Sequence, residues 1–439
     1  MVVGGHVAQQ IAAALRATLT PEESERIATR PTENIEAYDY YLRGLEFMER
    51  SYDERDMRIA VEMFESATQL DPSFALAYAK LSELHSQLYW FYFDRSQERL
   101  QQARRAVDRS LNLEPDLPEA HEALGYYYYW GHLDYERALQ HLELALSRQP
   151  GNSSLLAGIG FVQRRSGDFQ GALTHLEEAA KLDPRDPLRQ YEVGVTHQLL
   201  RDYPEAERHF DRALALAPDM MDSYAMKAWN YIIWEGSTSK ARAVLEEAAG
   251  MGLDSVDHPV AGYLWVILDV WDGHYEAALT RLSSGSSEAF SFQTYYVPKA
   301  LLAAGIHADR NELLLALQHL GAAVALLEAE IQKAPDDARL YGALGMAYAA
   351  MGRTEDAIRA GEKGVELLPV SREAWRGLWR VTDLARILMM TGQHDAAIDR
   401  IEFLLSVPGY MSVALLRVDP SWDPLRSHPR FQALLEKYE

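Results

Sequence analysis

Three histidines repeat at a fixed interval, and side chains of this type at a regular spacing could bind a metal ion. His141, His175 and His209 stand 34 residues apart, and imidazole is a common metal ligand. If the interval is one structural repeat, equivalent side chains lie roughly 10 Å apart, which is a helix-packing distance. Ligands of a shared metal ion need bonds of about 2 Å. We therefore interpret the three histidines as surface or packing residues, and we predict neither a metal site nor a cofactor.

Other catalytic signatures are missing from the sequence. It contains no cysteine, which excludes a thiol nucleophile, a disulfide framework and thiolate metal ligands. It also lacks the glycine-rich phosphate loop, the serine nucleophile elbow and the zinc motif His-Glu-x-x-His. Gly158 and Gly160 come nearest to a dinucleotide-binding fingerprint, but its third glycine is absent. We interpret this pair as helix-packing residues and predict that the protein is not an enzyme.

Composition narrows the class of partner. The 439 residues carry a formal net charge of −22, which disfavours nucleic acid because phosphate binding depends on lysine and arginine. The N-terminus has no basic region before its apolar stretch, so we expect no signal peptide. The most apolar internal run, residues 260–268, is shorter than the roughly 20 residues of a spanning helix. We therefore expect a cytoplasmic or otherwise soluble protein without membrane insertion.

A repeated pattern indicates the elements that must position any functional residue. Prolines recur 34 residues apart at Pro150, Pro184 and Pro218, and again at Pro335 and Pro369. Small residues lie twelve and five positions before several of these prolines, with a larger apolar residue between them in most cases. The sets are Ala172, Leu176 and Ala179; Ala206, Phe210 and Ala213; and Ala357, Gly361 and Gly364. This spacing predicts one helix packed closely on its neighbours, so that each unit is a pair of antiparallel helices.

The first half of several units adds an apolar residue followed by a glycine, as at Ile159 and Gly160, and in some units also a tyrosine, as at Leu124, Gly125 and Tyr128. With the Ala, Phe, Ala and Pro positions, these residues closely resemble the tetratricopeptide repeat of 34 residues. Looser copies extend the pattern over most of the chain, to about ten units. The resemblance implies an all-α fold, a right-handed superhelical solenoid of about ten helix pairs with helical caps.

The same register predicts the domain boundaries. We expect an N-terminal helical segment or cap over residues 1–35, which includes a capping box from Thr20 to Glu23. Units one to seven then occupy 36–282, units eight to ten occupy 283–408, and a capping tail occupies 409–439. The serine-rich residues 283–291 are the predicted flexible joint. In the tail, Trp422, Leu425 and Phe431 are expected to fold back onto the last repeat.

Two flanking stretches carry a second resemblance. Residues 30–44 (RPTENIEAYDYYLRG) and 418–435 (VDPSWDPLRSHPRFQALL) look like the flanks of the repeats in a group of bacterial signalling proteins. That group includes nucleotide cyclases, Ser/Thr kinases and winged-helix regulators, which carry a tetratricopeptide sensor region after an effector domain. The resemblance implies that this chain is such a sensor region and a fragment of a larger protein.

Function in this fold resides on the concave face, formed by the first helix of each pair. The register predicts nine groove residues for a peptide or protein segment: Tyr126, Tyr129, Trp130, Phe161, Arg164, Arg165, Tyr191, Gln198 and Trp229. Aromatic and arginine side chains are favoured as interface anchors, but the same aromatics could instead fill the interior of a tight superhelix. Adjacent helical residues face different ways, so we expect at most one of Arg164 and Arg165 to meet a ligand carboxylate.

An aromatic insert in the second unit leaves two interpretations open. Residues 89–93 (YWFYF) form either an exposed binding loop or a plug over a groove. We favour the plug, because so large an exposed apolar patch promotes aggregation.

Two functions therefore remain. The first is a non-catalytic module that binds a protein or peptide of unknown identity in its concave groove. The alternative is a structural array that forms a homo-oligomer or spaces a missing effector domain.

Overall fold

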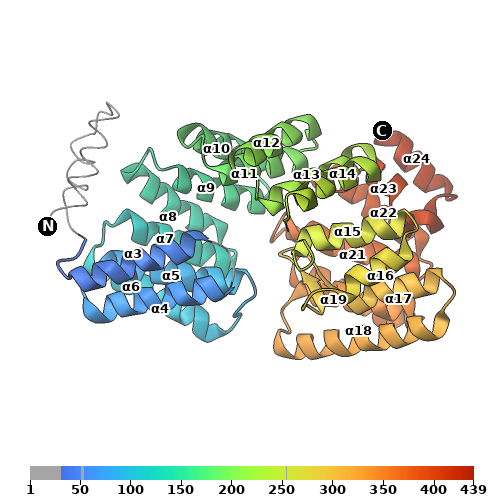
Figure 1. Cartoon of the computed structure of the whole chain (residues 1–439), viewed down its shortest axis with the longest axis horizontal. Coiled ribbons are helices and arrows are strands. Elements are labelled where there is room, and N and C mark those ends of the chain that lie inside the picture. Colours follow the sequence, from blue (N-terminus) through green and yellow to red (C-terminus); the bar gives the residue numbers. More distant parts are fainter. Residues whose placement is uncertain (1–30, 51–53, 254) are drawn as a thin grey trace. The chain divides into compact units, whose positions relative to one another are not determined.

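The computed structural model describes residues 31–50, 54–253 and 255–439, and most of them lie in helices (Figure 1). The chain divides into two compact units, Met1–Pro150 and Gly151–Glu439, called unit 1 and unit 2 below. The predicted N-terminal capping box, Thr20 to Glu23, lies outside the described residues. Unit 1 ends at Pro150, which is one of the prolines that recur in the repeat pattern. Within the described residues the helices pair as predicted, three pairs in unit 1 and seven in unit 2.

Unit 1 contains the first three helix pairs. Their helices are α3 (Ile35–Arg50), α4 (Glu54–Leu70), α5 (Ala75–Trp90), α6 (Gln97–Leu113), α7 (Pro118–Tyr126) with its π-helical continuation η1 (Tyr127–His132), and α8 (Tyr135–Arg148).

Unit 2 contains the other seven pairs and a C-terminal cap. The pairs are α9 (Ser153–Ser166) and α10 (Phe169–Leu182), α11 (Pro187–Leu199) and α12 (Tyr203–Leu216), α13 (Met221–Glu235) and α14 (Thr238–Gly250), α15 (Pro259–Trp271) and α16 (Tyr275–Ser283), α17 (Lys299–Asp309) and α18 (Leu313–Lys333), α19 (Ala338–Ala350) and α20 (Thr354–Leu367), and α21 (Arg376–Met390) and α22 (His394–Ser406). Strands β1 (Ala289–Ser291) and β2 (Tyr296–Pro298) precede α17, and the cap consists of α23 (Val413–Val418), η2 (Pro420–Leu425) and α24 (Pro429–Lys437).

The small, large, small spacing produces the expected contact between paired helices. Ala172, Leu176 and Ala179 on α10 are all fully buried. Opposite them on α9, a Cβ added at Gly160 would lie 2.8 Å from Cγ of Leu176. Glycine is therefore required there by the close approach of the two helices. The chain is an all-α helical-repeat solenoid, as the spacing predicted.

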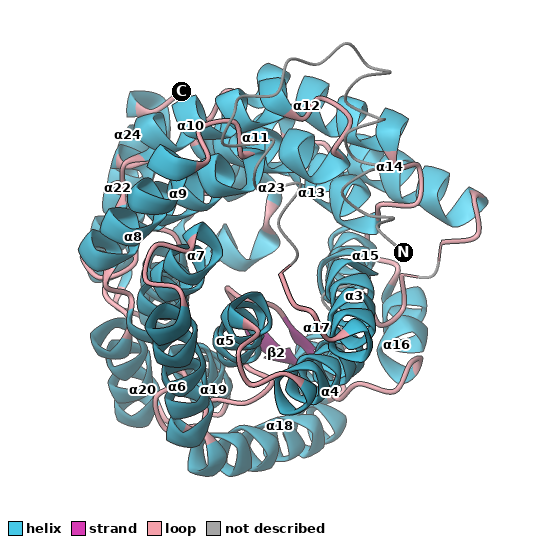
Figure 2. Ribbon diagram, turned by 90° about the vertical axis from the view of Figure 1, so that its left-hand side faces the viewer, coloured by secondary structure: helices cyan, strands magenta, loops and turns pink. Residues whose placement is uncertain are grey.

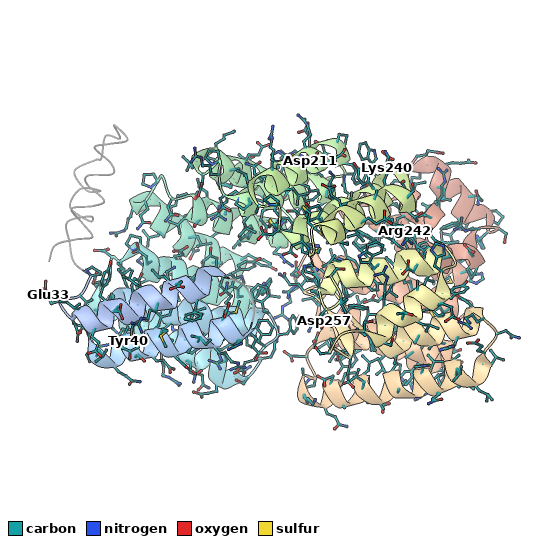
Figure 3. All side chains as sticks on the ribbon, viewed as in Figure 1. Glu33, Tyr40, Asp211, Lys240, Arg242 and Asp257 are labelled. Carbon is teal, nitrogen blue, oxygen red and sulfur yellow. The ribbon has the colours of Figure 1, made fainter. Side chains whose placement is uncertain are left out.

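The serine-rich residues predicted as a joint lie inside unit 2 and are held at both ends. The Asp257 carboxylate, labelled in Figure 3, accepts the backbone N–H of Ser286 at 3.2 Å. The Lys299 ammonium donates to the Ser284 carbonyl at 2.8 Å. The strands that follow form an antiparallel hairpin, seen among the helices in Figure 2, which pairs Phe290 with Val297. Phe290 is 3% exposed, so the hairpin belongs to the core of unit 2.

Unit 2 is closed by hydrogen bonds between segments about 200 residues apart. The Arg201 guanidinium donates to the carbonyls of Leu404, Val407 and Met411 at 2.8 to 3.3 Å. The Gly409 N–H donates to the Leu199 carbonyl at 2.8 Å. Arg201 has φ +63°, a left-handed conformation that is unusual outside glycine. Helices α13 and α23 lie side by side in the same closure (Figure 1).

The tail packs as predicted. Trp422, Leu425 and Phe431 are fully buried and join the core that contains α21 and α22. Arg386 on α21 reinforces this contact, because its guanidinium pairs with Asp419 at 2.7 Å. The residues after 408 therefore complete the hydrophobic core of unit 2.

Helix α18 carries an apolar outer face that the sequence pattern did not predict. Among the described residues it is the one helix long and apolar enough, by length and composition, to cross a membrane. Its inner face, which includes Leu320 and Leu327, is buried. On the other side Leu313, Leu314 and Leu317 are 60%, 85% and 54% exposed. Gln318 and His319 interrupt the apolar run of α18 in the sequence. For this reason the run was not predicted as a long apolar segment.

Candidate binding site

An aromatic turn in unit 1 contains three of the predicted groove residues. Helix α7 widens into the π-helix η1 after Tyr126 and ends at Leu133, whose φ of +54° is left-handed. The rings of Tyr126 and Trp130 stack with centroids 4.2 Å apart and an interplanar angle of 7°. Tyr126 and Tyr129 are buried, at 6% and 3% exposure, whereas Trp130 is half-buried. Of the three, Trp130 offers the most surface to a partner.

The aromatic insert lies against this turn. Trp90 is buried, and its ring centroid is 5.1 Å from that of Tyr129. Phe91 and Phe93 are half-buried and pack on the core of unit 1. The insert therefore covers part of unit 1, which favours the plug over the exposed loop.

The two arginines predicted for the groove are bound inside unit 2. Arg164 and Arg165 are 3% and 4% exposed, and both guanidinium groups lie over the Trp375 ring, at 4.6 and 4.1 Å from its centroid. Arg164 pairs with Glu192 at 2.7 Å, and Arg165 pairs with Glu373 at 3.3 Å. Carboxylates of the same chain thus pair with both side chains.

The pKa of Glu373 shows how strongly the neighbouring arginines act on this carboxylate. The carboxylate is fully buried, and burial alone raises a carboxyl pKa. Arg165 and Arg376 outweigh burial and hold the pKa of Glu373 below its ordinary value. The Arg165 pair is therefore a charged structural contact, and a buried pair of this kind strongly destabilises a fold when only one partner is removed.

Three further predicted residues contact neighbouring helices of unit 2. The Gln198 amide is fully buried and donates to the Met226 carbonyl at 3.1 Å and to Asn230 at 3.2 Å. Phe161 is half-buried, with the Arg164 guanidinium 5.5 Å from its ring centroid. Tyr191 is also half-buried, and burial raises the pKa of its hydroxyl well above the ordinary value. None of these three side chains lines the main cavity of unit 2.

Trp229 lines that cavity, which has a volume of about 850 Å³. Its walls come mainly from α13, α15, α17, α21 and the β1–β2 hairpin with its turn. The other aromatic wall residues were not predicted: Tyr263, Trp271, Phe292, Tyr295, Trp379 and Tyr410. They come from segments that no local pattern connects, so the sequence carried no signal for their meeting.

The histidines at 34-residue intervals have separate partners. His141 stacks on His121 and His209 stacks on His197, both with ring centroids 5.5 Å apart. His175 hydrogen-bonds to the Gly171 carbonyl at 3.1 Å. Among the residues that the structure describes, no group of three or more His, Asp or Glu side chains is placed to hold a metal ion.

Comparisons with known proteins find similarity to tetratricopeptide repeat proteins. A family model of the tetratricopeptide repeat matches residues 159–221 and 312–376. No curated protein gives a significant match. A thermophilic TPR protein from Thermus thermophilus is 18% identical over 45% of this chain and 99% of its own, with a TM-score of 0.39. A tetratricopeptide repeat protein from Parabacteroides merdae is 17% identical over 65% of this chain and 100% of its own, with a TM-score of 0.40.

A dimer of human IFIT1 is 15% identical over 82% of this chain and 76% of its own, with a TM-score of 0.47. The family match falls on α9 to α12 and on α18 to α20, whose second helices carry the spacing of small residues at Ala172, Ala206 and Ala357. The recurring helix pairs and this match together show that the chain carries tetratricopeptide repeats.

Proposed function

We propose that the chain is a non-catalytic module that binds a peptide or protein segment through the aromatic turn around Trp130. The stacked pair of Tyr126 and Trp130 carries this proposal. A tryptophan held flat on a buried tyrosine loses little side-chain freedom on binding, so more of its contact energy appears as affinity. Tryptophan and tyrosine are also enriched among residues that dominate binding energy.

The resemblance of residues 30–44 and 418–435 to flanks in signalling proteins supports a finer proposal. In that case the chain is the sensor region of a bacterial signalling protein, and the bound segment belongs to an effector domain or its target. The half-buried Trp130 is the contact residue in either case.

The test uses peptides selected from a random library against the full chain. Affinities for the selected peptides are measured by calorimetry with wild-type protein, Trp130→Ala and Trp229→Ala. We expect Trp130→Ala to weaken binding at least about 30-fold, which corresponds to about 2 kcal/mol for an anchor residue. Trp229→Ala, which alters the cavity of unit 2, serves as the control and leaves the affinity unchanged.

Two outcomes would contradict the proposal. Equal binding by Trp130→Ala, with an unchanged helical melt, would remove the aromatic turn from the interface. Loss of binding with Trp229→Ala alone would place the peptide in unit 2 instead.

The outer face of α18 favours a second candidate function, self-association. Leu314 and Leu317 project from one side of this helix and are 85% and 54% exposed. A second copy of the chain can bury the same leucines against its own, as in the isologous interface of a twofold dimer. Light scattering should then give a dimer for wild type and a monomer for Leu314→Glu with Leu317→Glu. Leu216→Glu is the control, because Leu216 is 41% exposed on α12; a wild-type monomer would exclude this candidate.

A further inference from the structure

The cavity of unit 2 is held open among large side chains. This space measures about 850 Å³ and is open to solvent on one side, where Met390 is 42% exposed. The hydrogen bonds of Arg201 and Gly409 join the end of α11 to the segment around the end of α22. The helices around the cavity therefore cannot move together to fill it without breaking those contacts.

Five rings form a continuous wall inside the cavity. Trp229 contacts Tyr410 at a centroid distance of 6.5 Å, and Tyr410 contacts Trp379 at 5.5 Å. Trp379 contacts Tyr295 at 5.8 Å, and Tyr295 contacts Tyr263 at 5.2 Å. All four contacts are tilted or edge-on, so each ring is fixed by the next. Fixed aromatic walls with a few polar groups are typical of small-molecule sites of 300 to 1,000 Å³.

Two polar groups of the wall have no hydrogen-bond partner. Nε1 of Trp379 and Oγ of Ser421 are both buried and unpaired, and both residues line the cavity. A buried donor without an acceptor is costly, and a ligand oxygen would satisfy it. By contrast, the charges of Arg386 and Asp419 neutralise each other across 2.7 Å. An ionic ligand in the buried part of the wall would have to give up its hydration without meeting an unpaired countercharge; the other acidic residue of the lining, Asp309, is exposed to solvent.

We propose that unit 2 is a receptor for a small, uncharged and mainly apolar molecule that carries one hydrogen-bond acceptor. The molecule fills the cavity and accepts the indole N–H of Trp379. Four methionines in the wall, Met226, Met346, Met389 and Met390, adapt to an irregular shape because their side chains are unbranched and polarisable. Met390 is 42% exposed and marks the mouth at the end of α21. This site is separate from the peptide surface proposed for Trp130.

A glycine in the wall allows the cavity to be filled without disturbing the fold. Gly305 lines the cavity from α17, and a Cβ added there meets no atom within 4 Å. Gly305 is exposed at the cavity wall, so Gly305→Phe has room for a ring there and is designed to occupy the cavity while improving the helix propensity of α17. Gly321 on α18 is the matched control, because a Cβ there also meets no atom within 4 Å and the residue lies outside the cavity.

The experiment titrates the full chain with Nile red, an uncharged apolar dye that carries a carbonyl acceptor. We expect one dye per chain with blue-shifted emission. Gly305→Phe should weaken binding at least about ten-fold by occupying the space, whereas Gly321→Phe should bind as the wild type does. Trp379→Phe keeps a ring but removes the donor, and should weaken binding about five-fold, as expected for one hydrogen bond.

Three results would overturn the proposal. The first is unchanged affinity with Gly305→Phe when its helical melt is intact. The second is an equal loss with Gly321→Phe, which would place the dye on the exposed leucines of α18. The third is displacement of the dye by a library peptide whose own binding requires Trp229, which would make the cavity a peptide site.

Discussion

Replacing Arg201 tests whether the closure of unit 2 supports its stability. The guanidinium reaches the carbonyls of Leu404 and Val407 at the end of α22, and that of Met411 beyond it. These carbonyls include ones that a helix leaves without an internal partner, and a positive charge is favourable at this end of a helix. Burial lowers the pKa of Arg201, and the guanidinium is held by backbone oxygens in the bonds described.

The size of the effect follows from the bonds and the backbone. Three shared, partly buried hydrogen bonds at about 1 kcal/mol each predict that Arg201→Ala lowers the free energy of unfolding by about 3 kcal/mol. Arg201→Gly loses the same bonds but relieves the left-handed strain of about 1 to 2 kcal/mol. Glycine also makes the unfolded chain more flexible, which costs about 0.5 to 1 kcal/mol. We therefore expect Arg201→Gly to be about 1 kcal/mol less destabilising than Arg201→Ala.

Urea unfolding followed by tryptophan fluorescence measures these differences in the full chain. Seven of the nine tryptophans lie in unit 2, so the signal reports mainly on that unit. Arg201→Lys is the matched control, because it keeps the charge and loses the planar fork; it should fall between Arg201→Ala and wild type. An Arg201→Ala variant within about 0.5 kcal/mol of wild type would refute the reasoning. So would a glycine variant that is no more stable than the alanine variant.

Three further predictions follow from burial and close contact. Burial, with His197 alongside, lowers the pKa of His209 to about 4; the folded state resists a proton that the unfolded chain accepts near pH 6.5. Stability should thus be complete above about pH 6.5 and fall toward pH 4, and melts of His209→Gln should show a smaller fall. A Cβ at Gly345 would lie 2.4 Å from Cδ1 of Ile387. Gly345→Ala should lower the free energy of unfolding by about 1 to 3 kcal/mol, whereas Gly321→Ala should raise it by up to about 1 kcal/mol. Equal urea midpoints for the two variants would contradict both predictions. Ending the chain before Pro420 removes the buried Trp422 and its neighbours, so an unchanged melting temperature would contradict the capping role.

Much of the fold could be predicted from the sequence, because a tetratricopeptide repeat is specified by contacts close in the chain. Leu176 meets Gly160 only 16 positions away, and the same spacing recurs in unit after unit. The ten helix pairs and the packing of the tail follow from such local patterns. The hairpin at 289–298 lies outside the repeat pattern, so the register gave no sign of it.

The candidate site was less predictable, because its contacts join distant segments. Arg165 was placed correctly on a first helix, but its partner Glu373 is 208 residues away. The wall residues Trp379 and Tyr410 likewise meet Trp229 only through the closure of unit 2. Register predicts which face of a helix a residue occupies. It does not predict which distant segment covers that face.

The closure of unit 2 also has a consequence for how the chain folds. Each helix pair can form soon after it is synthesised, since its contacts are local and repeats add by nearest-neighbour interactions. The bonds from Arg201 to Leu404, Val407 and Met411 span 203 to 210 residues. These bonds can form only when nearly the whole chain is present, and their formation costs the entropy of closing a very long loop. Refolding should accordingly show early helix formation followed by a slower, late step in which the segments around Arg201 and Val407 join and the cavity takes its shape.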